Sequence, residues 1–317
     1  MMSISGTVRT KEQRRAASRR AFLHFKRSWQ MYVLFFLPLL YFVIFKYGAF
    51  FWMSIAFKDY SVMDGLWGSE WVGFKYFNMF LQDPYFWKLI RNTILLNLCM
   101  LVFYFPFPII LALMINEVRV KQFRKFVQTV SYLPYFFSTV VICGLVVNFL
   151  ATEGMVNNLI AALGGNRIQF MTSPEWFRPV YVISEIWQNA GWGSIIYLAA
   201  LSGVDTELYE AAVIDGANRW QQMRRISLPS IAPVISIQFL LTVGQLLTIG
   251  YEKVLLLYNG STRETADVIS TYIYRRGLIA AEYSYGAAVN IFQAVLALIL
   301  ICAANKAAAR IGSTSLW

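Results

Sequence analysis

Six long apolar segments constrain the fold of this chain more than any other feature of its sequence. A transmembrane helix needs about 20 mostly apolar residues to cross a hydrocarbon core of about 30 Å. Backbone polar groups in lipid must be satisfied within the protein, so such segments fold as helices. The segments lie near residues 31–51, 93–115, 129–149, 180–201, 231–250 and 285–304. The sequence therefore predicts an all-α, polytopic membrane protein with six transmembrane helices.

The composition agrees with a membrane protein. Charged residues make up 14% of the chain, against about 25% in a typical soluble domain. The first apolar segment is too long for the core of a cleavable signal peptide, and no small-residue cleavage pattern follows it, so we expect a retained helix. Cys99, Cys143 and Cys302 lie in apolar segments without the spacing of a disulfide framework or metal site. We expect packing roles for them and no metal site.

The distribution of basic residues predicts the orientation, because Lys and Arg concentrate in cytoplasmic loops. The C-terminal tail contains two basic residues and no acidic one, and the N-terminal tail contains eight: Arg9, Lys11, Arg14, Arg15, Arg19, Arg20, Lys26 and Arg27. We expect a basic cytoplasmic tail (1–28), one membrane domain (29–305) and a cytoplasmic C-terminal tail (306–317). The N-terminal tail supplies most of the net charge of +11, which favours contact with anionic lipid over nucleic-acid binding.

A polar elbow at residues 205–229 interrupts the apolar segments on the predicted cytoplasmic side. Asp205 or Thr206 is suited to cap a short helix, and Glu210 falls in its early turns, where negative charge is favoured. Gly216 is suited to end that helix in a left-handed conformation. A second short helix follows, and a proline then forces a break before the fifth apolar segment. The elbow therefore predicts a rigid, exposed surface for a partner protein.

The elbow resembles the cytoplasmic signature loop of permease subunits in binding-protein-dependent ABC importers. That signature is Glu-Ala-Ala, three residues, Gly, nine residues and Ile-x-Leu-Pro, and every position is matched here by Glu210, Ala211, Ala212, Gly216, Ile226, Leu228 and Pro229. The resemblance covers most of the chain from about Met31, and residues 272–288 also resemble the run before the last helix of maltose-type sugar permeases. It implies a type I ABC importer permease fold with six transmembrane helices and a cytoplasmic coupling helix.

The resemblance also implies the partners. A dimer of separate ATP-binding subunits would receive the elbow, with Glu210 paired to a basic residue, Ala211 and Ala212 allowing close docking and Gly216 allowing the turn. The Ile-x-Leu-Pro end would anchor the elbow to the membrane domain. A second, different permease subunit and a periplasmic or lipid-anchored solute-binding protein complete the expected complex. This chain contains no Walker pattern, so we expect ATP and magnesium on the ATPase subunit, and no cofactor or catalytic residue here.

Polar side chains inside the apolar segments are candidates for the substrate pathway, because they are costly in lipid and tend to face a cavity or the bundle interior. Their spacing of three or four residues places each set on one helix face. The fourth segment contains Glu185, Gln188, Asn189 and Trp192, and the fifth contains Gln238, Thr242, Gln245 and Thr248. Amides and carboxylates bond hydroxyl groups, and aromatic faces suit sugar rings. Hydrogen bonding between helices of the bundle is the alternative interpretation of the same residues.

We therefore predict a non-catalytic permease subunit in the bacterial inner membrane, with both termini in the cytoplasm. It would import an oligosaccharide by ATP-driven alternating access, and the resemblance points most closely to acidic, alginate-like sugars. Import of another small solute and secondary transport are the alternatives, although a secondary transporter does not need the elbow signature. A membrane enzyme is disfavoured, because the one histidine, His24, lies in the basic tail and no His-based catalytic or zinc site can form in the apolar segments.

Overall fold

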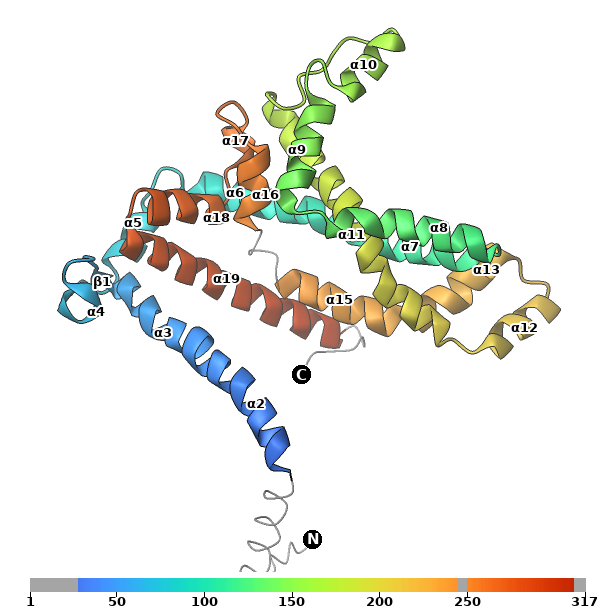
Figure 1. Cartoon of the computed structure of the whole chain (residues 1–317), viewed down its shortest axis with the longest axis horizontal. Coiled ribbons are helices and arrows are strands. Elements are labelled where there is room, and N and C mark those ends of the chain that lie inside the picture. The colour runs from blue at the N-terminus through green and yellow to red at the C-terminus, as the bar shows by residue number, and fades with distance from the viewer. Residues whose placement is uncertain (1–27, 245–249, 311–317) are drawn as a thin grey trace, which may run out of the picture. The chain divides into compact units, whose positions relative to one another are not determined.

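The computed structural model describes residues 28–244 and 250–310, and these residues are almost entirely helical (Figure 1). The strands in the described part are β1 (Lys58–Asp59) and β2 (Glu70–Trp71), which pair antiparallel with Lys58 opposite Trp71. The chain divides into two compact units, residues 1–55 and 56–317, and each is described by itself. The helical content agrees with the predicted all-α class.

The described residues of the first unit form a single apolar helical segment. It is built from α2 (Trp29–Tyr41), the π-helical turn η1 (Phe42–Tyr47) and α3 (Gly48–Trp52), and no residue of these three elements is buried. The segment continues to Phe57, which gives a candidate membrane span of 29 residues with a mean hydropathy of 2.0. This matches the first predicted span, whose apolar side chains need lipid or another protein around them.

The second unit contains three further helical segments that are long and apolar enough to cross a membrane. These are Phe86–Glu117, Thr139–Ala162 and Tyr283–Ala303, and the bent pair Arg219–Ser230 and Ala232–Gly244 adds one more if counted as a single span. The described residues thus contain four such helices, or five with the bent pair. The predicted fourth span corresponds to α11 (Phe177–Ser202), a helix of 26 residues that is not among them. Its polar side chains lower its hydropathy, and the predicted count of six is not confirmed.

The remaining elements fill the connections between these segments. The Phe86–Glu117 segment consists of α6 (Phe86–Cys99), η3 (Met100–Tyr104) and α7 (Pro106–Glu117), and the final helix is α19 (Tyr283–Arg310). Short helices lie on the connections: α4 (Gly65–Gly68), α5 (Lys75–Leu81), η5 (Pro174–Trp176), α16 (Tyr251–Leu257), α17 (Arg263–Ala266), α18 (Ile269–Ile273) and η7 (Tyr274–Ile279).

The predicted third span, 129–149, is wrong as a continuous helix. The chain forms α8 (Lys121–Tyr132), the 3-10 turn η4 (Leu133–Phe136) and then α9 (Thr139–Leu150), which leaves α8 at a steep angle (Figure 1). Pro134 lies in the turn, and Ser138 is extended and caps α9 by accepting the Val141 N–H at 3.4 Å. Proline and an N-cap serine end one helix and begin another even where the composition stays apolar. After α9 comes α10 (Met155–Ala162).

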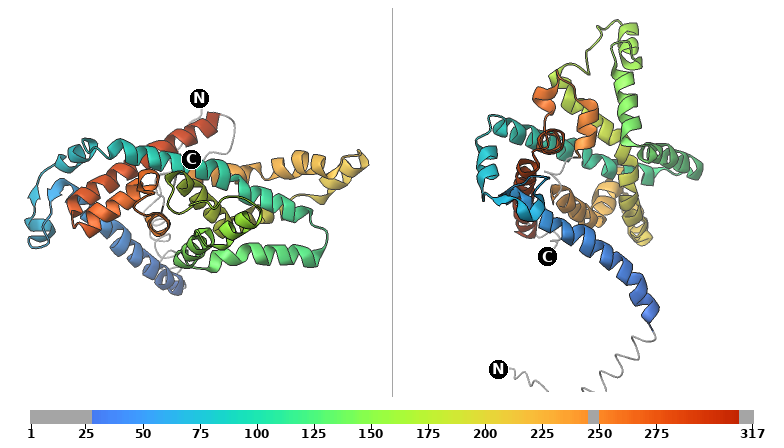
Figure 2. Two further views of the ribbon diagram at one scale, coloured as in Figure 1. Left: turned by 90° about the horizontal axis from the view of Figure 1, so that it is seen from above. Right: turned by 60° about the vertical axis from the view of Figure 1, so that its left-hand side comes forward.

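Helix α11 lies at the centre of the second unit and contacts α7, α8, α9 and α15. Figure 2 shows this arrangement from two further sides. Buried side chains of α7 and α11 form one apolar cluster with Ile231, and those of α6, α9, α11 and α16 form another. Gly191 lets α11 approach α8 very closely, since a Cβ atom there would lie 1.9 Å from the Ser131 carbonyl oxygen.

We expect Gly191→Ala to destabilise the protein, because the added methyl group would overlap the backbone of α8. Overpacking of this kind costs about 1–3 kcal/mol or more. Thermal unfolding of the purified protein should therefore begin at a lower temperature. Gly144→Ala is the matched control, since a Cβ atom at Gly144 meets nothing within 4 Å. Equal unfolding temperatures for the two variants would contradict the close contact.

Candidate functional site

The first helix of the elbow has the caps that the sequence predicts. Helix α12 (Thr206–Ile214) begins after Asp205, whose carboxylate accepts the Glu207 N–H at 3.0 Å. It ends at Gly216, which has a φ of +76°, and the N–H groups of Gly216 and Ala217 donate to carbonyls of the last turn. Glycine adopts this left-handed conformation at little cost. The predicted helix and its glycine-dependent end are confirmed.

The second half of the elbow turns the chain toward the fifth apolar segment. Asn218 and Gln221 cap each other reciprocally at the start of α13 (Arg219–Gln222), with bonds of 2.9 and 2.8 Å. The π-helical turn η6 (Met223–Ser227) and α14 (Leu228–Ser230) follow. The chain then bends by 60° into α15 (Ala232–Gly244). The predicted break is present, at the residue after α14 rather than at Pro229 itself.

One contact joins the two halves of the elbow, and another fixes the elbow to the rest of the second unit. The hydroxyl groups of Tyr209, in α12, and Ser227, in η6, lie 2.9 Å apart and share a hydrogen bond. Arg219 donates to the Glu117 carbonyl oxygen at 3.3 Å and lies 3.7 Å from its carboxylate, at the end of α7. Because both short helices are attached in this way, a force on the elbow would reach α7 and the start of α15.

The elbow exposes apolar side chains although it is polar in sequence. No residue of α12 is buried, and Ile214 and Trp220 are 85% and 65% exposed. Of the predicted coupling residues, Glu210, Ala211 and Gly216 are exposed, while Ala212 and Ile226 are half-buried. Leu228 and Pro229 are also exposed. Exposed apolar patches rimmed by polar residues mark interaction sites. The sequence analysis did not single out Ile214 and Trp220, although apolar residues in a polar elbow were a usable signal.

The predicted polar face of α11 forms a buried ionic cluster. The Lys253 ammonium lies 3.1 Å from Glu185 Oε1 and donates to Gln188 Oε1 at 3.0 Å. Asn189 Nδ2 donates to the second carboxylate oxygen of Glu185 at 2.5 Å. The Tyr181 ring faces the ammonium with its centroid 5.9 Å away. Lys253 is 5% exposed, so its charge depends on these partners. The sequence analysis missed Lys253 because it lies just beyond the fifth apolar segment.

The same helix face contacts the break between α8 and α9. Gln188 Nε2 donates to the Phe137 carbonyl oxygen at 3.5 Å, which gives a partner to a backbone group outside both helices. The Trp192 ring stacks on Tyr135 with a centroid distance of 4.6 Å and an interplanar angle of 3°, and Phe136 meets it edge-on. Irregular backbone inside a membrane protein is tolerated where the protein itself satisfies it.

A pocket of 370 Å³ lies between η3, α15 and the C-terminal half of α11, next to this cluster. Its polar lining includes Tyr104 in η3, Trp192 and Tyr197 in α11, and Gln238 and Thr242 in α15. Thr242 Oγ1 donates to the Gln238 carbonyl oxygen at 2.8 Å. The structure thus brings Trp192, Gln238 and Thr242 to one pocket, while Glu185, Gln188 and Asn189 bond within the cluster beside it. Gln245 and Thr248 lie outside the described residues.

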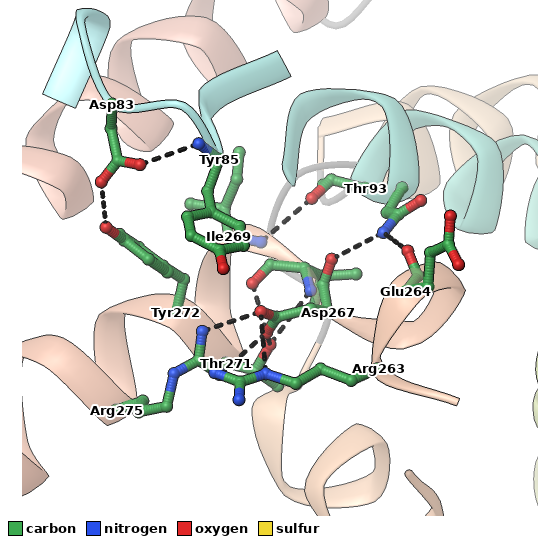
Figure 3. A network of polar contacts seen from close by, with 12 residues as sticks. Asp83, Tyr85, Thr93, Arg263, Glu264, Asp267, Ile269, Thr271, Tyr272 and Arg275 are labelled. Atoms are coloured by element: carbon green, nitrogen blue, oxygen red, sulfur yellow. Dashed lines mark hydrogen bonds and ion pairs between the residues drawn. The ribbon is translucent and has the colours of Figure 1, made fainter. Parts of the chain in front are cut away.

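A separate polar network holds the segment 259–282 to α6 (Figure 3). Asp267 is 3% exposed and accepts two hydrogen bonds from the Arg275 guanidinium, at 2.7 and 3.2 Å. Asn92 Nδ2 donates to the carbonyl oxygens of Glu264 and Asp267, and the Thr93 hydroxyl accepts the Ile269 N–H. Nothing in the sequence pattern links these distant residues. The network fixes α17 and α18, which follow α16, the helix that contains Lys253.

Asp83 makes a second attachment at the same end of α6. The Tyr272 hydroxyl and the Tyr85 N–H donate to the Asp83 carboxylate (Figure 3). The Tyr285 hydroxyl also donates to it, at 3.1 Å. Partial burial opposes ionisation, but the hydrogen bonds from Tyr272, Tyr85 and Tyr285 lower the pKa of Asp83 below its usual value. The carboxylate therefore stays charged and joins the α5–α6 connection to α18 and α19.

We expect Lys253→Met to be strongly destabilising, because it leaves the Glu185 carboxylate buried without its counter-charge. Breaking a buried pair from one side costs about 3–5 kcal/mol, whereas removing both charges is often neutral. Lys253→Met combined with Glu185→Gln should therefore recover most of the lost thermal stability. Arg167→Met is the control, since its partner Glu153 is exposed, and exposed pairs contribute at most about 1 kcal/mol. A double variant no more stable than Lys253→Met would rule out mutual neutralisation.

Comparison with known proteins gives consistent matches over the whole chain. A family model described as "Binding-protein-dependent transport system inner membrane component" matches residues 104–311, which include the elbow, α11 and α15. The polygalacturonan/rhamnogalacturonan transport system permease protein YteP of Bacillus subtilis (strain 168) is 41% identical and covers 99% of this chain and 97% of its own length. Protein LplB of the same strain is 44% identical over 92% of each chain.

Two solved structures are also similar to this chain. One is a bacterial ABC transporter involved in the import of the acidic polysaccharide alginate, with 45% identity, a TM-score of 0.84, and coverage of 92% of this chain and 99% of the other. The second is a bacterial alginate ABC transporter in complex with an alginate pentasaccharide-bound periplasmic protein, with 45% identity, a TM-score of 0.85, and coverage of 94% and 100%. At this identity the likeness extends beyond the fold.

Proposed function

Because the chain belongs to the family of binding-protein-dependent transport system inner membrane components, we propose that it imports uronate-containing oligosaccharides. The predicted ABC importer permease fold is confirmed, and the chain is a multi-pass inner-membrane permease of a sugar importer. The acidic substrate is the proposed step. One observation carries this step: the similar proteins transport acidic polysaccharides. YteP belongs to a polygalacturonan/rhamnogalacturonan transport system, and both similar structures are of alginate transporters.

The buried Lys253 supplies chemistry in this chain that suits such a substrate. Its ammonium is bonded to Glu185 and Gln188, and the neighbouring pocket offers the amide and hydroxyl groups of Gln238 and Thr242. In the proposed cycle a uronate carboxylate replaces Glu185 at the ammonium as the sugar passes. Charge-assisted hydrogen bonds of this kind are among the stronger interactions available. Tyr104 and Trp192 provide aromatic faces for the sugar rings.

The elbow is the proposed binding surface for the ATPase subunits. In this proposal two copies of a separate subunit bind ATP and magnesium and receive α12, with Glu210 paired to a basic residue and Ala211 and Ala212 at the closest contact. The exposed Ile214 and Trp220 add apolar area to that contact. Closure of the ATPase dimer then moves α12 and α13 as one body, because Tyr209 and Arg219 attach them to η6 and α7. This is a two-state element biased by ligand.

The rest of the complex follows from the same reasoning. A second, different permease subunit completes the pathway, and a solute-binding protein delivers the sugar from outside, as the complex of the alginate transporter with its periplasmic protein supports. In this proposal both termini lie in the cytoplasm. Residues 1–28 form the basic N-terminal tail, 29–305 the membrane domain and 306–317 the C-terminal tail. Import of another small solute and secondary transport are the alternatives that the sequence left open, and no feature of the described structure favours either.

A reconstituted importer tests the substrate. Oligogalacturonate, delivered by the cognate binding protein, should stimulate ATP hydrolysis, and the same oligomer with its carboxyl groups reduced to alcohols should not. Lys253→Gln combined with Glu185→Gln, which removes both charges of the buried pair and so leaves neither alone, should lower the preference for the acidic oligomer about tenfold, as expected for loss of one charge-assisted hydrogen bond. Glu264→Gln, at an exposed acidic residue, is the control for general effects of charge. Equal stimulation by the acidic and reduced oligomers would refute the proposed substrate class.

Substitutions at Gly216 test the elbow. Gly216→Val forces a β-branched residue into the left-handed conformation, which costs about 1–2 kcal/mol and should disorder the end of α12. We expect the ATPase subunit to be lost on co-purification, together with transport. Gly216→Asn is the matched control, because asparagine tolerates this conformation, and it should keep the subunit bound. Transport at full rate in the valine variant, with ATP hydrolysis still coupled, would show that the elbow is not the joint.

A further inference from the structure

A short hairpin between the first apolar segment and α5 exposes large apolar side chains. It consists of β1, α4 and β2 and spans residues 58–71. Met63 and Trp67 are 96% and 88% exposed, more than any other large apolar side chain in the described part of the chain, and Val62 is 69% exposed. Apolar groups of this size are unfavourable in water unless another molecule covers them. These three residues, the hairpin tip, therefore form a candidate docking surface.

Hydrogen bonds across the turn hold the hairpin in one conformation. Lys58 Nζ donates to the Leu66 carbonyl oxygen at 2.7 Å. The Ser69 hydroxyl, which is buried, accepts the Ser61 N–H at 3.2 Å and donates to a carbonyl oxygen of α4 at 2.6 Å. A loop that is already ordered loses little conformational entropy when a partner binds it. The tip is thus presented by a preformed support.

The base of the hairpin is attached to α19 and α5. The Tyr60 N–H donates to the Ser284 hydroxyl at 2.9 Å, and the Tyr60 ring meets the Tyr283 ring edge-on with a centroid distance of 6.0 Å. On the other side, the Tyr76 hydroxyl donates to the Asp59 carboxylate. Helix α19 in turn packs against α15, which supplies two polar residues to the pocket described above. A partner bound at the tip would therefore be connected to the pocket through two packed helices.

The hairpin and the elbow lie at opposite ends of the second unit. Figures 1 and 2 show α4 at one end and α12 at the other. The present inference rests on the proposed function, which places the elbow in the cytoplasm and so places the hairpin outside the membrane. The solute-binding protein is the partner that this function requires on that side.

Two acidic side chains accompany the apolar tip. Asp64 and Glu70 are exposed, and neither forms an ion pair with another residue in the described part of the chain. Anionic lipid headgroups would repel these carboxylates, so a lipid surface does not match the tip. A protein with basic residues around an apolar hollow matches both the charges and the apolar groups. Trp and Met are also enriched at protein interfaces.

We propose that the hairpin tip docks the solute-binding protein. Met63 and Trp67 enter an apolar hollow on that protein, and basic residues at the rim of the hollow pair with Asp64 and Glu70. The binding protein is thereby fixed at the start of α19, at the end of the permease from which the sugar enters.

Photocrosslinking in the complete importer tests the contact. p-Benzoylphenylalanine would replace Met63 in one sample and Ile214 of the elbow, which is 85% exposed, in another, with the cognate binding protein and oligogalacturonate present. We expect the probe at Met63 to crosslink the binding protein and the probe at Ile214 to crosslink the ATPase subunit. Loss of the first crosslink alone would overturn the docking surface and leave the proposed function intact. Crosslinks from Met63 only to lipid or to the second permease subunit would also overturn it.

The dependence of ATP hydrolysis on the concentration of binding protein gives a second measurement. Trp67→Ser combined with Met63→Ser should raise the half-maximal concentration about tenfold and leave the maximal rate unchanged, because a few anchors of this type dominate the affinity of an interface. Asp64→Asn combined with Glu70→Gln should reduce the effect of salt on that concentration. Phe123→Ser, at an exposed aromatic residue in the first turn of α8, is the control and should change neither. An unchanged half-maximal concentration in the first variant would refute the proposal.

Discussion

The neutralisation of the polar face of α11 is the constraint on which the rest of the second unit depends. A helix with a carboxylate and two amides along one side cannot rest in hydrocarbon unless neighbouring elements supply partners. Lys253 provides the counter-charge from α16 and donates to the Gln188 side-chain oxygen, while the Gln188 amide nitrogen donates to the Phe137 carbonyl oxygen. These bonds position α16 and explain how the chain can break between α8 and α9 without leaving a bare carbonyl. The close approach at Gly191 then brings α8 against the same helix.

The sequence predicts the elbow well because its structure is local. Asp205, Asn218 and Gly216 each act within a few residues of their position, so caps and turns can be recognised without knowing the fold. The prediction of the third span is wrong because its composition is apolar throughout, and composition does not show that Pro134 and Ser138 end one helix and begin the next. Lys253 and its partners lie 65 or more residues apart, and spacing along the chain does not reveal such contacts. The count of membrane spans is affected in a similar way. The polar face of α11 lowers the hydropathy of that helix, although its polar side chains are bonded within the protein.

The two halves of the proposed mechanism meet in α11 and the segments beside it. At one end, Arg219 attaches the elbow to the last residue of α7, and α7 packs against the last turns of α11 through an apolar cluster. At the other end, Asn92 and Arg275 hold Asp267, in the segment that follows α16, the helix that contains Lys253. Movement imposed on the elbow would therefore be felt as a shift of α11 against a fixed outer segment. The ionic cluster lies where that shift would act.

The separation of Gln188 and Lys253 by 65 residues also has a consequence for how the protein is made. A ribosome adds about 5–20 residues per second, so α11 leaves it several seconds before α16 exists. During that interval the Glu185 carboxylate has no ammonium beside it. Until then it must either stay in contact with water or the insertion machinery, or be protonated. The ionic cluster on α11 is thus completed only once α16 has been made, before α17, α18 and α19 follow along the chain, and a nascent chain released before α16 would leave Glu185 without its counter-charge.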